Sequence, residues 1–301
     1  MRAQGAAKLA AMQANLFALS AIVLWASLAA LGVSLQHVPP FLLTGIALVT
    51  GSVLAWPSVL RQPRQWKLAP ATLALGVFTL FGFHFFLFMG LRLAPAVQVN
   101  LVNYLWPLLM VVLAPWYLPG SRLRGVHVLA AGIGFAGAAL AILGRSGAVG
   151  ASTDSPGGTA ALGYLLALAS ALIWANYSLQ TKRLAMAGTG FPTAALGLFG
   201  LLSGALSLLC HALLEAPVRL SPTDWALLAA LGVGPLGGAF YLWDAALKRG
   251  DARHIGLLSF LTPLLSTLAL LWVRQETPSG SVLAAALMVV GAAVLGSRAK
   301  G

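Results

Sequence analysis

Ten apolar runs, each long enough to cross a lipid bilayer, alternate with short connections along this chain. They cover residues 15–35, 40–60, 69–91, 94–115, 124–144, 160–181, 191–213, 223–246, 252–273 and 279–297. A helix needs roughly 20 apolar residues to cross the hydrocarbon core. Among chain segments in lipid, only helices and closed barrels pair all their backbone groups. The sequence therefore predicts an all-α membrane protein with ten transmembrane helices.

The scarcity of charge excludes a soluble globular protein. Hydrophobic residues make up 59% of the chain and charged residues 8%, whereas soluble domains carry about 25% charged residues. The net charge of +12 comes from short basic clusters between the apolar runs, which is typical of loops beside a bilayer. We therefore expect a lipid bilayer as partner and no binding to nucleic acid. The single cysteine, Cys210, cannot form an intrachain disulfide.

The distribution of basic residues predicts the orientation of the chain. With ten spans, fourteen of the 18 lysines and arginines fall on the side of the two termini, and four fall on the other side. Those four are Arg92, Arg145, Arg219 and Arg274. Cytoplasmic loops carry the excess of Lys and Arg in membrane proteins. Both termini are therefore predicted to be cytoplasmic.

The two halves of the chain resemble each other. A connection rich in Gly, Ser, Thr and Pro predicts a first repeat over 1–145, a linker over 146–158 and a second repeat over 159–301. An offset of 156 residues places Pro107 on Pro263, and it also pairs Arg92 with Lys248, Tyr104 with Phe260, and Trp116 with Trp272. Because each half holds five spans, the repeats must run in opposite directions. This five-plus-five inverted repeat is typical of secondary transporters, whose site lies near the midplane.

The fourth run contains a polar stretch that lipid alone does not explain. Asn100, Asn103 and Tyr104 are polar groups within it, and an unpaired amide in hydrocarbon costs several kcal/mol. We expect these side chains to face protein or water. Pro107 removes a helical hydrogen bond and should bend the span. We interpret Pro107 and its repeat partner Pro263 as hinges.

Two further polar groups lie within apolar runs and leave alternatives open. His84 could be a neutral hydrogen-bonding group between helices, a substrate contact or part of a proton relay. Asp244 lies four residues before Lys248, in the favourable order for a helical ion pair. That pair could be purely structural, or it could act in gating or proton coupling.

Aromatic and polar side chains together indicate a binding cavity between the halves. Such a cavity can stack a planar ring and bind a zwitterion through uncharged dipoles. The candidate substrate-binding residues are Trp25, His84, Asn100, Asn103, Tyr104, Trp106, Trp174, Tyr177, Tyr241, Phe260 and Thr262. We expect no enzyme, metal site or cofactor, because His84 has no evident nucleophile or ligand partner. The GxGxxG pattern at residues 132–137 lies inside an apolar run without a preceding strand, so helix packing is the favoured interpretation.

The segment Leu101-Val-Asn-Tyr-Leu-Trp-Pro107, with Ser259-Phe-Leu-Thr-Pro263, resembles the EamA-type drug/metabolite transporter superfamily and, within it, the YddG-like aromatic amino-acid exporters. At Arg274-Gln275-Glu276 the Gln replaces a Gly that such repeats often carry. The resemblance implies a bacterial inner-membrane exporter of aromatic amino acids and related metabolites, working by alternating access. The alternative is a broad-specificity drug or metabolite exporter of the same superfamily. Small multidrug exporters need a carboxylate in the first span, which this chain lacks.

Overall fold

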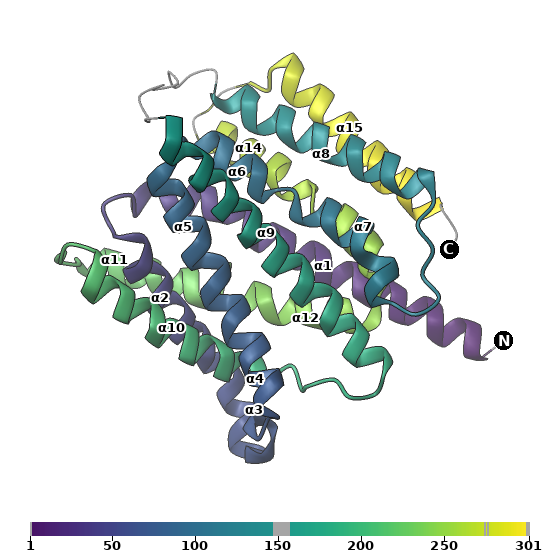
Figure 1. The fold of residues 1–301 in the computed structure, drawn as a ribbon, viewed down its shortest axis with the longest axis horizontal. Helices are drawn as coiled ribbons and strands as arrows, with labels where there is room; N and C mark the ends of the chain where they lie inside the picture. The colour runs from purple at the N-terminus through teal and green to yellow at the C-terminus, as the bar shows by residue number, and fades with distance from the viewer. Residues whose placement is uncertain (1, 147–156, 274, 276, 299–301) are drawn as a thin grey trace.

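The computed structural model describes residues 2–146, 157–273, 275 and 277–298, and this part of the chain is helical without strands (Figure 1). The first half comprises α1 (Arg2–Ser34), α2 (Pro40–Ser52), α3 (Trp56–Arg61), α4 (Pro70–Val77), α5 (Phe83–Leu93), α6 (Ala96–Asn103), α7 (Trp106–Tyr117) and α8 (Gly125–Ser146). The second half comprises α9 (Gly157–Met186), α10 (Ala195–Leu214), α11 (Pro222–Val233), α12 (Gly238–Arg249), α13 (Ala252–Leu258), α14 (Leu261–Val273) and α15 (Gly280–Arg298). The short turns η1 (Val53–Ala55), η2 (Pro63–Trp66) and the π-helical η3 (Phe78–Gly82) join neighbouring helices.

The predicted all-α architecture is confirmed for the described residues. They contain nine apolar helical segments of at least 18 residues, each long enough to cross a bilayer. A tenth segment, Gly280–Gly296, is apolar but shorter. Several predicted features lie outside the described residues: most of the linker, including Asp154, and both Arg274 and Glu276. The protein is thus a multi-pass membrane protein.

Two apolar segments are broken just before a proline. The first break lies at Tyr104 and Leu105, between α6 and α7, and Pro107 stands in the first turn of α7. The second lies at Ser259 and Phe260, between α13 and α14, and Pro263 stands in the first turn of α14. Proline lacks an N–H, and its ring clashes with the carbonyl four residues earlier, so a helix begins near it more readily than it passes through. The predicted bend at Pro107 is therefore a break between two helices.

Two other segments are irregular at matching positions. The π-helical turn Phe78–Gly82 separates α4 from α5. In the second half, residues 234–237 interrupt the helix between α11 and α12, where Pro235 follows Gly234. The offset of 156 residues that pairs the two prolines carries 78–82 onto 234–238. Both halves thus depart from regular helix at corresponding points.

The helices pack as two groups with further pairs outside them. In the α1 group, α1 runs along α12 and α14; in the α9 group, α9 runs along α5, α6 and α7 (Figure 1). Outside the groups, α2 packs on α10, and α8 packs on α15. The pattern is symmetric, because α1 and α9 are the first helices of the two halves. The candidate site lies between the two groups.

The GxGxxG segment in α8 serves helix packing, as predicted. A Cβ on Gly134 would lie 2.5 Å from the Phe260 ring, and one on Gly137 would lie 2.9 Å from Met288 of α15. At Gly132 such a Cβ would meet no atom of another described helix within 4 Å. Two of the three glycines therefore allow close approach of neighbouring helices.

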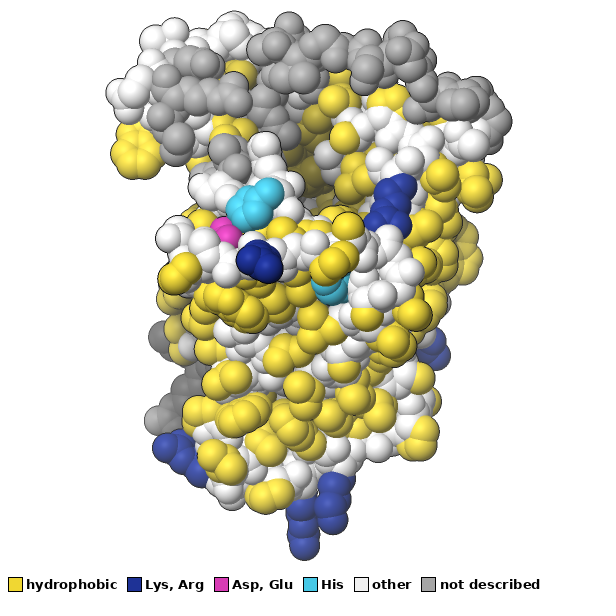
Figure 2. Space-filling view, turned by 90° about the vertical axis from the view of Figure 1, so that its left-hand side faces the viewer, with side chains coloured by type: hydrophobic (Ala, Val, Ile, Leu, Met, Phe, Trp, Pro, Cys, Tyr) yellow, Lys and Arg dark blue, Asp and Glu magenta, His cyan; other side chains and the backbone are white. Residues whose placement is uncertain are grey.

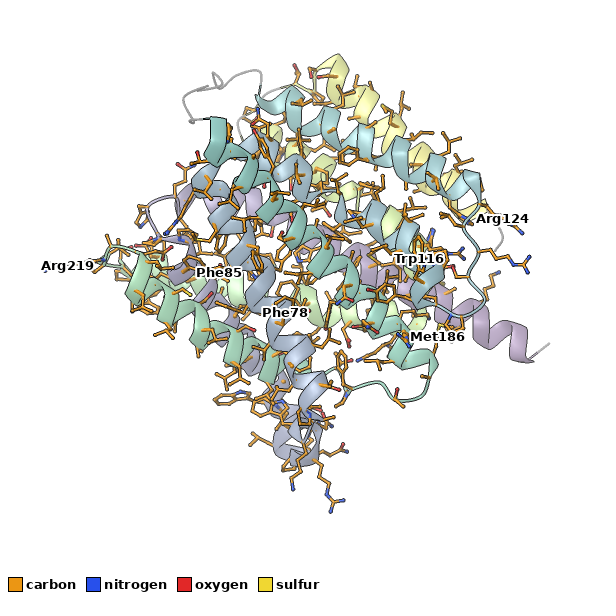
Figure 3. The ribbon with its side chains drawn as sticks, in the orientation of Figure 1. Phe78, Phe85, Trp116, Arg124, Met186 and Arg219 are labelled. Atoms are coloured by element: carbon orange, nitrogen blue, oxygen red, sulfur yellow. The ribbon has the colours of Figure 1, made fainter. Side chains whose placement is uncertain are left out.

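The outer surface is apolar, as a lipid-facing surface must be. Leu213, Leu287 and Trp272 have exposed fractions of 73%, 77% and 76%. Hydrophobic side chains predominate on the face drawn in Figure 2. Figure 3 places Arg219 at one end of the molecule and both Arg124 and Met186 at the opposite end. We refer to these as the Arg219 end and the Arg124 end.

Candidate functional site

A cavity of about 410 Å³ lies between the α1 group and the α9 group. Its lining on the first side includes Trp25 of α1 and Thr262 of α14, and on the second side His84 of α5 and Asn103 of α6. In the apolar segments Lys8–Leu28, Pro70–Leu93 and Ala96–Tyr117, the lining residues lie in the half nearest the α1–α2 or the α5–α6 connection. The cavity therefore occupies the half of the molecule toward the Arg219 end (Figure 1).

Five aromatic side chains form a floor between this cavity and the Arg124 end. We call them the aromatic floor: Trp25, Trp106, Trp174, Phe240 and Trp243. The ring centroid of Trp25 lies 5.1 Å from that of Trp243 and 5.9 Å from that of Trp174. The centroids of Trp106 and Trp243 are 5.5 Å apart, and those of Trp174 and Phe240 are 5.4 Å apart. Four of the rings line the cavity, while Trp243 is fully buried beneath them.

The floor joins the two groups of helices. Trp106 and Trp174 belong to the α9 group, whereas Trp25, Phe240 and Trp243 belong to the α1 group. The indole N–H of Trp243 also donates to the hydroxyl of Ser178 in α9, at 3.1 Å. Aromatic pairs at such distances contribute about 0.5–1.5 kcal/mol each beyond their area burial. The floor thus holds the groups together on the side away from the cavity.

His84 faces the cavity with one nitrogen already occupied. Its Nδ1 lies 2.6 Å from the carbonyl oxygen of Leu80, and since a carbonyl only accepts, Nδ1 carries the proton. In the neutral ring, Nε2 is then a hydrogen-bond acceptor. Leu80 belongs to the π-helical turn before α5, and such turns are frequent at functional sites. The structure therefore presents a fixed acceptor at this point of the wall.

Asn103 presents the complementary group. The hydroxyl of Ser170 in α9 donates to its Oδ1 at 2.6 Å, which leaves the amide N–H groups as donors. Asn103 is the last residue of α6, immediately before the break, and only 8% of it is exposed. Asn100 and Tyr104 line the cavity beside it. Ser170 thus fixes the amide orientation that a ligand would meet.

Two threonine hydroxyls of the cavity lining, one from α2 and one from α14, remain available. The Oγ1 atoms of Thr44 and Thr262 are buried, and no atom of the described residues forms a hydrogen bond with either. Both residues line the cavity. A buried hydroxyl left without a partner costs about 1–3 kcal/mol. A polar ligand in the cavity would remove part of this cost.

Eight of the eleven candidate substrate-binding residues line the cavity, together with Pro263. The other three lie elsewhere. Tyr177 is buried beneath Trp174, with ring centroids 5.8 Å apart, and the hydroxyl of Tyr241 donates to the carbonyl of Gly51 at 3.2 Å. Phe260 is fully buried in the notch at Gly134. Pro107 is buried behind the floor at the start of α7.

Sequence reasoning did not select several lining residues. They are Leu28, Leu43, Thr44, Phe83, Leu87, Phe88, Ile142, Leu236, Phe240 and Ser266. Most are aliphatic or lone hydroxyl side chains that look like ordinary core residues in an apolar run. Ser170 was also missed, because a serine in α9 gives no sign of the asparagine it meets in α6. Phe83 and Phe240 were recognisable as aromatic residues within apolar runs.

A second polar cluster lies below the floor, toward the Arg124 end. The predicted ion pair is confirmed: the Lys248 ammonium is 2.6 Å from Oδ2 of Asp244. The Thr193 hydroxyl donates to the same oxygen at 2.6 Å. Asp244 is fully buried. Burying such a pair is tolerable only because each charge has a partner.

The sequence profile of the EamA-like transporter family matches residues 12–143 and 161–297. The chain belongs to the EamA-like transporter family. This confirms the resemblance drawn from the Asn-Tyr-Leu-Trp-Pro segment. Among the described residues of this EamA-like transporter, no group of three His, Cys, Asp or Glu side chains is placed to hold a metal ion.

Named relatives of this EamA-like transporter extend over nearly its whole length. The aromatic amino acid exporter YddG of Ancylobacter novellus is 42% identical over 291 residues, covering 93% of this chain and 96% of that protein. The protein of the same name from Escherichia coli (strain K12) is 28% identical over 301 residues, covering 94% and 96%. A crystal structure with 40% sequence identity matches with a TM-score of 0.86, covering 95% of this chain and 96% of its own.

Proposed function

We propose that this EamA-like transporter exports aromatic amino acids and related metabolites across the bacterial inner membrane by alternating access. The names of the two relatives support the substrate class. The observation that carries the proposal is the cavity itself. It combines a floor of indole and phenyl rings with a fixed acceptor on His84 and fixed donors on Asn103. An aromatic zwitterion has a ring, an ammonium and a carboxylate to match these three features.

The proposed architecture is ten transmembrane helices in a five-plus-five inverted repeat, with the linker at 146–158. The broken helices support it, because each half has an irregular third span and a fourth span broken just before a proline. The family profile also matches two segments, one in each half. Trp116 and Trp272, which the offset of 156 pairs, are both strongly exposed, at 73% and 76%. Tryptophan is enriched at both membrane–water interfaces, so this exposure fits two equivalent interfacial positions.

The excess of basic residues supports an orientation with the Arg124 end and both termini in the cytoplasm and the Arg219 end in the periplasm. In this orientation the cavity occupies the periplasmic half, and the aromatic floor closes the cytoplasmic half. The conformation is then outward-facing. Tyr177 lies beneath Trp174, and Tyr241 lies beside the floor, between Phe240 and Trp243 in α12. We propose that they, with Phe260, meet substrate after the two groups of helices have tilted.

The ligand orientation follows from the hydrogen bonds already made by the wall. We propose that Nε2 of His84 accepts from the substrate ammonium and that the Asn103 amide donates to its carboxylate. The substrate ring then lies over Trp25, Trp106 and Trp174. Uncharged partners suffice because the ligand brings both charges, so no buried ion has to be desolvated in the empty cavity. Asn100, Tyr104 and Thr262 complete the proposed site.

Equilibrium binding to the purified protein tests this proposal, with ligands that lose one group at a time. Tryptophan should bind. Tryptamine lacks the carboxylate and indole-3-propionate lacks the ammonium, so each should bind at least about tenfold more weakly, since a hydrogen bond to a charged group contributes about 1.5–3 kcal/mol. Alanine keeps the zwitterion without the ring and should bind weakly. Equal binding of tryptophan, tryptamine and unrelated aromatic drugs would instead indicate a broad-specificity exporter.

A further inference from the structure

Two basic side chains contact a phenyl ring in the same way at opposite ends of the molecule. The Lys248 ammonium lies 4.4 Å from the ring centroid of Phe191, which precedes α10. The Arg92 guanidinium lies 5.7 Å from the ring centroid of Phe41, in the first turn of α2. Lys248 lies at the end of α12 and Arg92 at the end of α5, and the offset of 156 residues pairs them. Each contact joins the end of a third span to the start of the second span in its own half.

The contact at the Arg124 end is tight. The Lys248 ammonium donates to the backbone carbonyl of Phe191 at 2.8 Å and to the buried carboxylate of Asp244 at 2.6 Å. Only 17% of the Lys248 side chain is exposed. It therefore ties α12 of the α1 group to the segment that follows α9. This end lies below the aromatic floor, where the two groups are closed.

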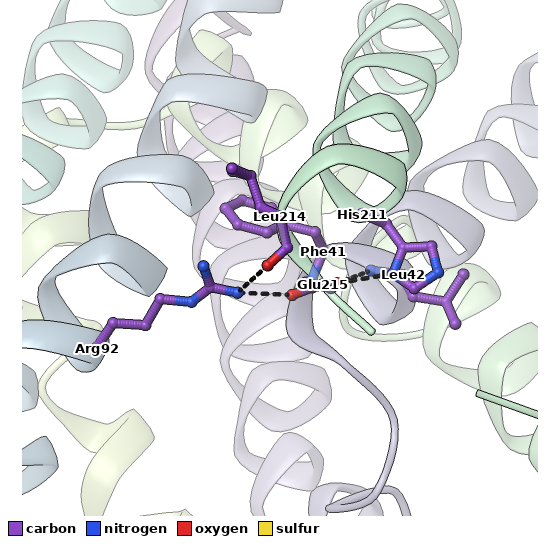
Figure 4. A network of polar contacts seen from close by, with 6 residues as sticks. All are labelled: Phe41, Leu42, Arg92, His211, Leu214 and Glu215. Atoms are coloured by element: carbon purple, nitrogen blue, oxygen red, sulfur yellow. Dashed lines mark hydrogen bonds and ion pairs between the residues drawn. The ribbon is translucent and has the colours of Figure 1, made fainter. Parts of the chain in front are cut away.

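The contact at the Arg219 end is looser (Figure 4). The Arg92 guanidinium is 3.5 Å from the Glu215 carboxylate and 3.4 Å from the Leu214 carbonyl oxygen, and 37% of its side chain is exposed. Glu215 itself is held firmly, because it accepts from the backbone N–H groups of Phe41 and Leu42 at 3.0 and 3.2 Å. The Glu215 carboxylate is thus fixed at the start of α2, whereas the Arg92 guanidinium contacts it only at 3.5 Å. This is the end toward which the cavity lies.

We propose that Lys248 with Phe191 and Arg92 with Phe41 are two equivalent latches that tighten in turn, one for each end of the transport pathway. The proposal rests on the alternating access proposed above. In the present conformation the Lys248 latch is closed and the Arg92 latch is slack. When the two groups tilt, the end of α5 approaches the start of α2, and the Arg92 latch tightens as the Lys248 latch separates. A cation over a ring is attracted more strongly once water is excluded, so each latch stabilises the closed end.

The labelling rates of engineered cysteines measure the balance between the two conformations, open toward the Arg219 end or toward the Arg124 end, in the absence of substrate. On a Cys210→Ser background, Leu43→Cys places a reporter thiol in the cavity, and Thr181→Cys places one in a buried position of α9 below the floor. Lys248→Met should lower the rate at which a membrane-impermeant reagent labels the cavity reporter by about tenfold, because the closed end loses the ammonium that binds Phe191 and pairs with the buried Asp244 carboxylate. The same variant should raise the labelling rate of the α9 reporter. Arg92→Met should shift both rates in the opposite direction, and the double variant should return both toward those of the background protein.

Two controls separate latching from general loosening. Arg249 lies 5.2 Å from the ring of Phe17, but this contact joins α12 to α1 within one group, so Arg249→Met should leave both rates unchanged. Lys248→Arg keeps a cation over Phe191 and should restore the background rates. Shifts in the same direction for Lys248→Met and Arg92→Met, or no shift in either, would overturn the latches. The labelling assay contains no substrate, so that result would overturn the latches without contradicting the proposed exporter function. The binding experiment tests that function separately.

Discussion

At the residue scale, the polar wall of the cavity depends on hydrogen bonds that leave one atom of each group available. Ser170 donates to the oxygen of Asn103, which lines the cavity, so the amide N–H groups remain as donors for a ligand. We predict that Asn103→Ala weakens binding of all amino acids alike, by about tenfold, because it removes the donors to the shared carboxylate. Ser170→Ala should weaken binding less, by about threefold, since the Asn103 amide can still rotate and donate to the carboxylate. Ser207→Ala, another buried serine, is the matched control and should have no effect.

The rings should govern selectivity between substrates. Trp174 lines the cavity and contacts three other members of the aromatic floor that line it too. Trp174→Ala or Tyr104→Ala should reduce the preference for tryptophan and phenylalanine over small amino acids, because only the aromatic substrates lose a stacking partner. The ratio of inhibition constants in a competition assay measures this, and a general loss of folded protein leaves that ratio unchanged. An unaltered preference in both variants would mean that the substrate ring lies elsewhere.

Single residues were predictable from the sequence where their chemistry conflicts with lipid. His84, Asn100 and Asn103 stand out in apolar runs, and all three line the cavity. Ser170 does not stand out, because its role depends on an asparagine 67 residues away in the chain. Phe260 was selected as the repeat partner of Tyr104, yet the two rings face different surroundings. The pattern of residue types did not show that Gly134 of α8 leaves the space in which the Phe260 ring is buried.

At the scale of helices, the breaks before Pro107 and Pro263 divide two long apolar segments into parts that can tilt separately. We predict that Pro107→Ala or Pro263→Ala slows transport several-fold while equilibrium binding stays nearly unchanged, because the hinge is used only in the conformational step. Pro115 lies inside α7, away from the break, and Pro115→Ala is the control. Wild-type transport rates in both hinge variants would exclude the hinge assignment.

Helix positions followed closely from apolar periodicity and length, except that α1 begins at Arg2, well before the expected run at residues 15–35. The π-helical turn at Phe78–Gly82 could not be predicted from the sequence, because no residue in that stretch requires it. Its counterpart between α11 and α12 carried a visible signal in Gly234 and Pro235. The break in α6–α7 was foreseen as a bend from the proline alone. Proline and glycine residues therefore indicate three of the four irregular points: the breaks before Pro107 and Pro263 and the interruption at residues 234–237.

At the scale of the whole molecule, the proposed inverted repeat predicts which loops share a side of the membrane. Cysteines placed at Lys67, Arg124 and Lys182 on the Cys210→Ser background should react with an impermeant reagent only from the cytoplasm. Cysteines placed at Arg92 and Asp154 should react only from the periplasm, because five spans separate residue 154 from either terminus. Reaction of residue 154 from the same side as the N-terminus would refute the inverted repeat.

The overall arrangement was predictable because the bilayer leaves few solutions for a chain with this pattern of apolar runs. The conformation, that is, the end of the molecule toward which the cavity lies, was not predictable. Whether the cavity lies toward one end or the other depends on small differences between two packings of the same helices, which a pattern of residue types does not encode. The aromatic floor and the contact of Lys248 with Phe191 are visible only once the two groups of helices are placed together.

The most direct test of the central claim is counterflow in proteoliposomes. Vesicles loaded with unlabelled tryptophan should accumulate labelled tryptophan from outside many times faster than vesicles loaded with alanine, because only an aromatic zwitterion should engage both the floor and the polar wall during exchange. Trp116→Ala changes an exposed tryptophan that does not line the cavity, so its exchange should be normal, whereas Asn103→Ala should slow exchange. Equal exchange with alanine and tryptophan, or unimpaired exchange by Asn103→Ala, would contradict the account.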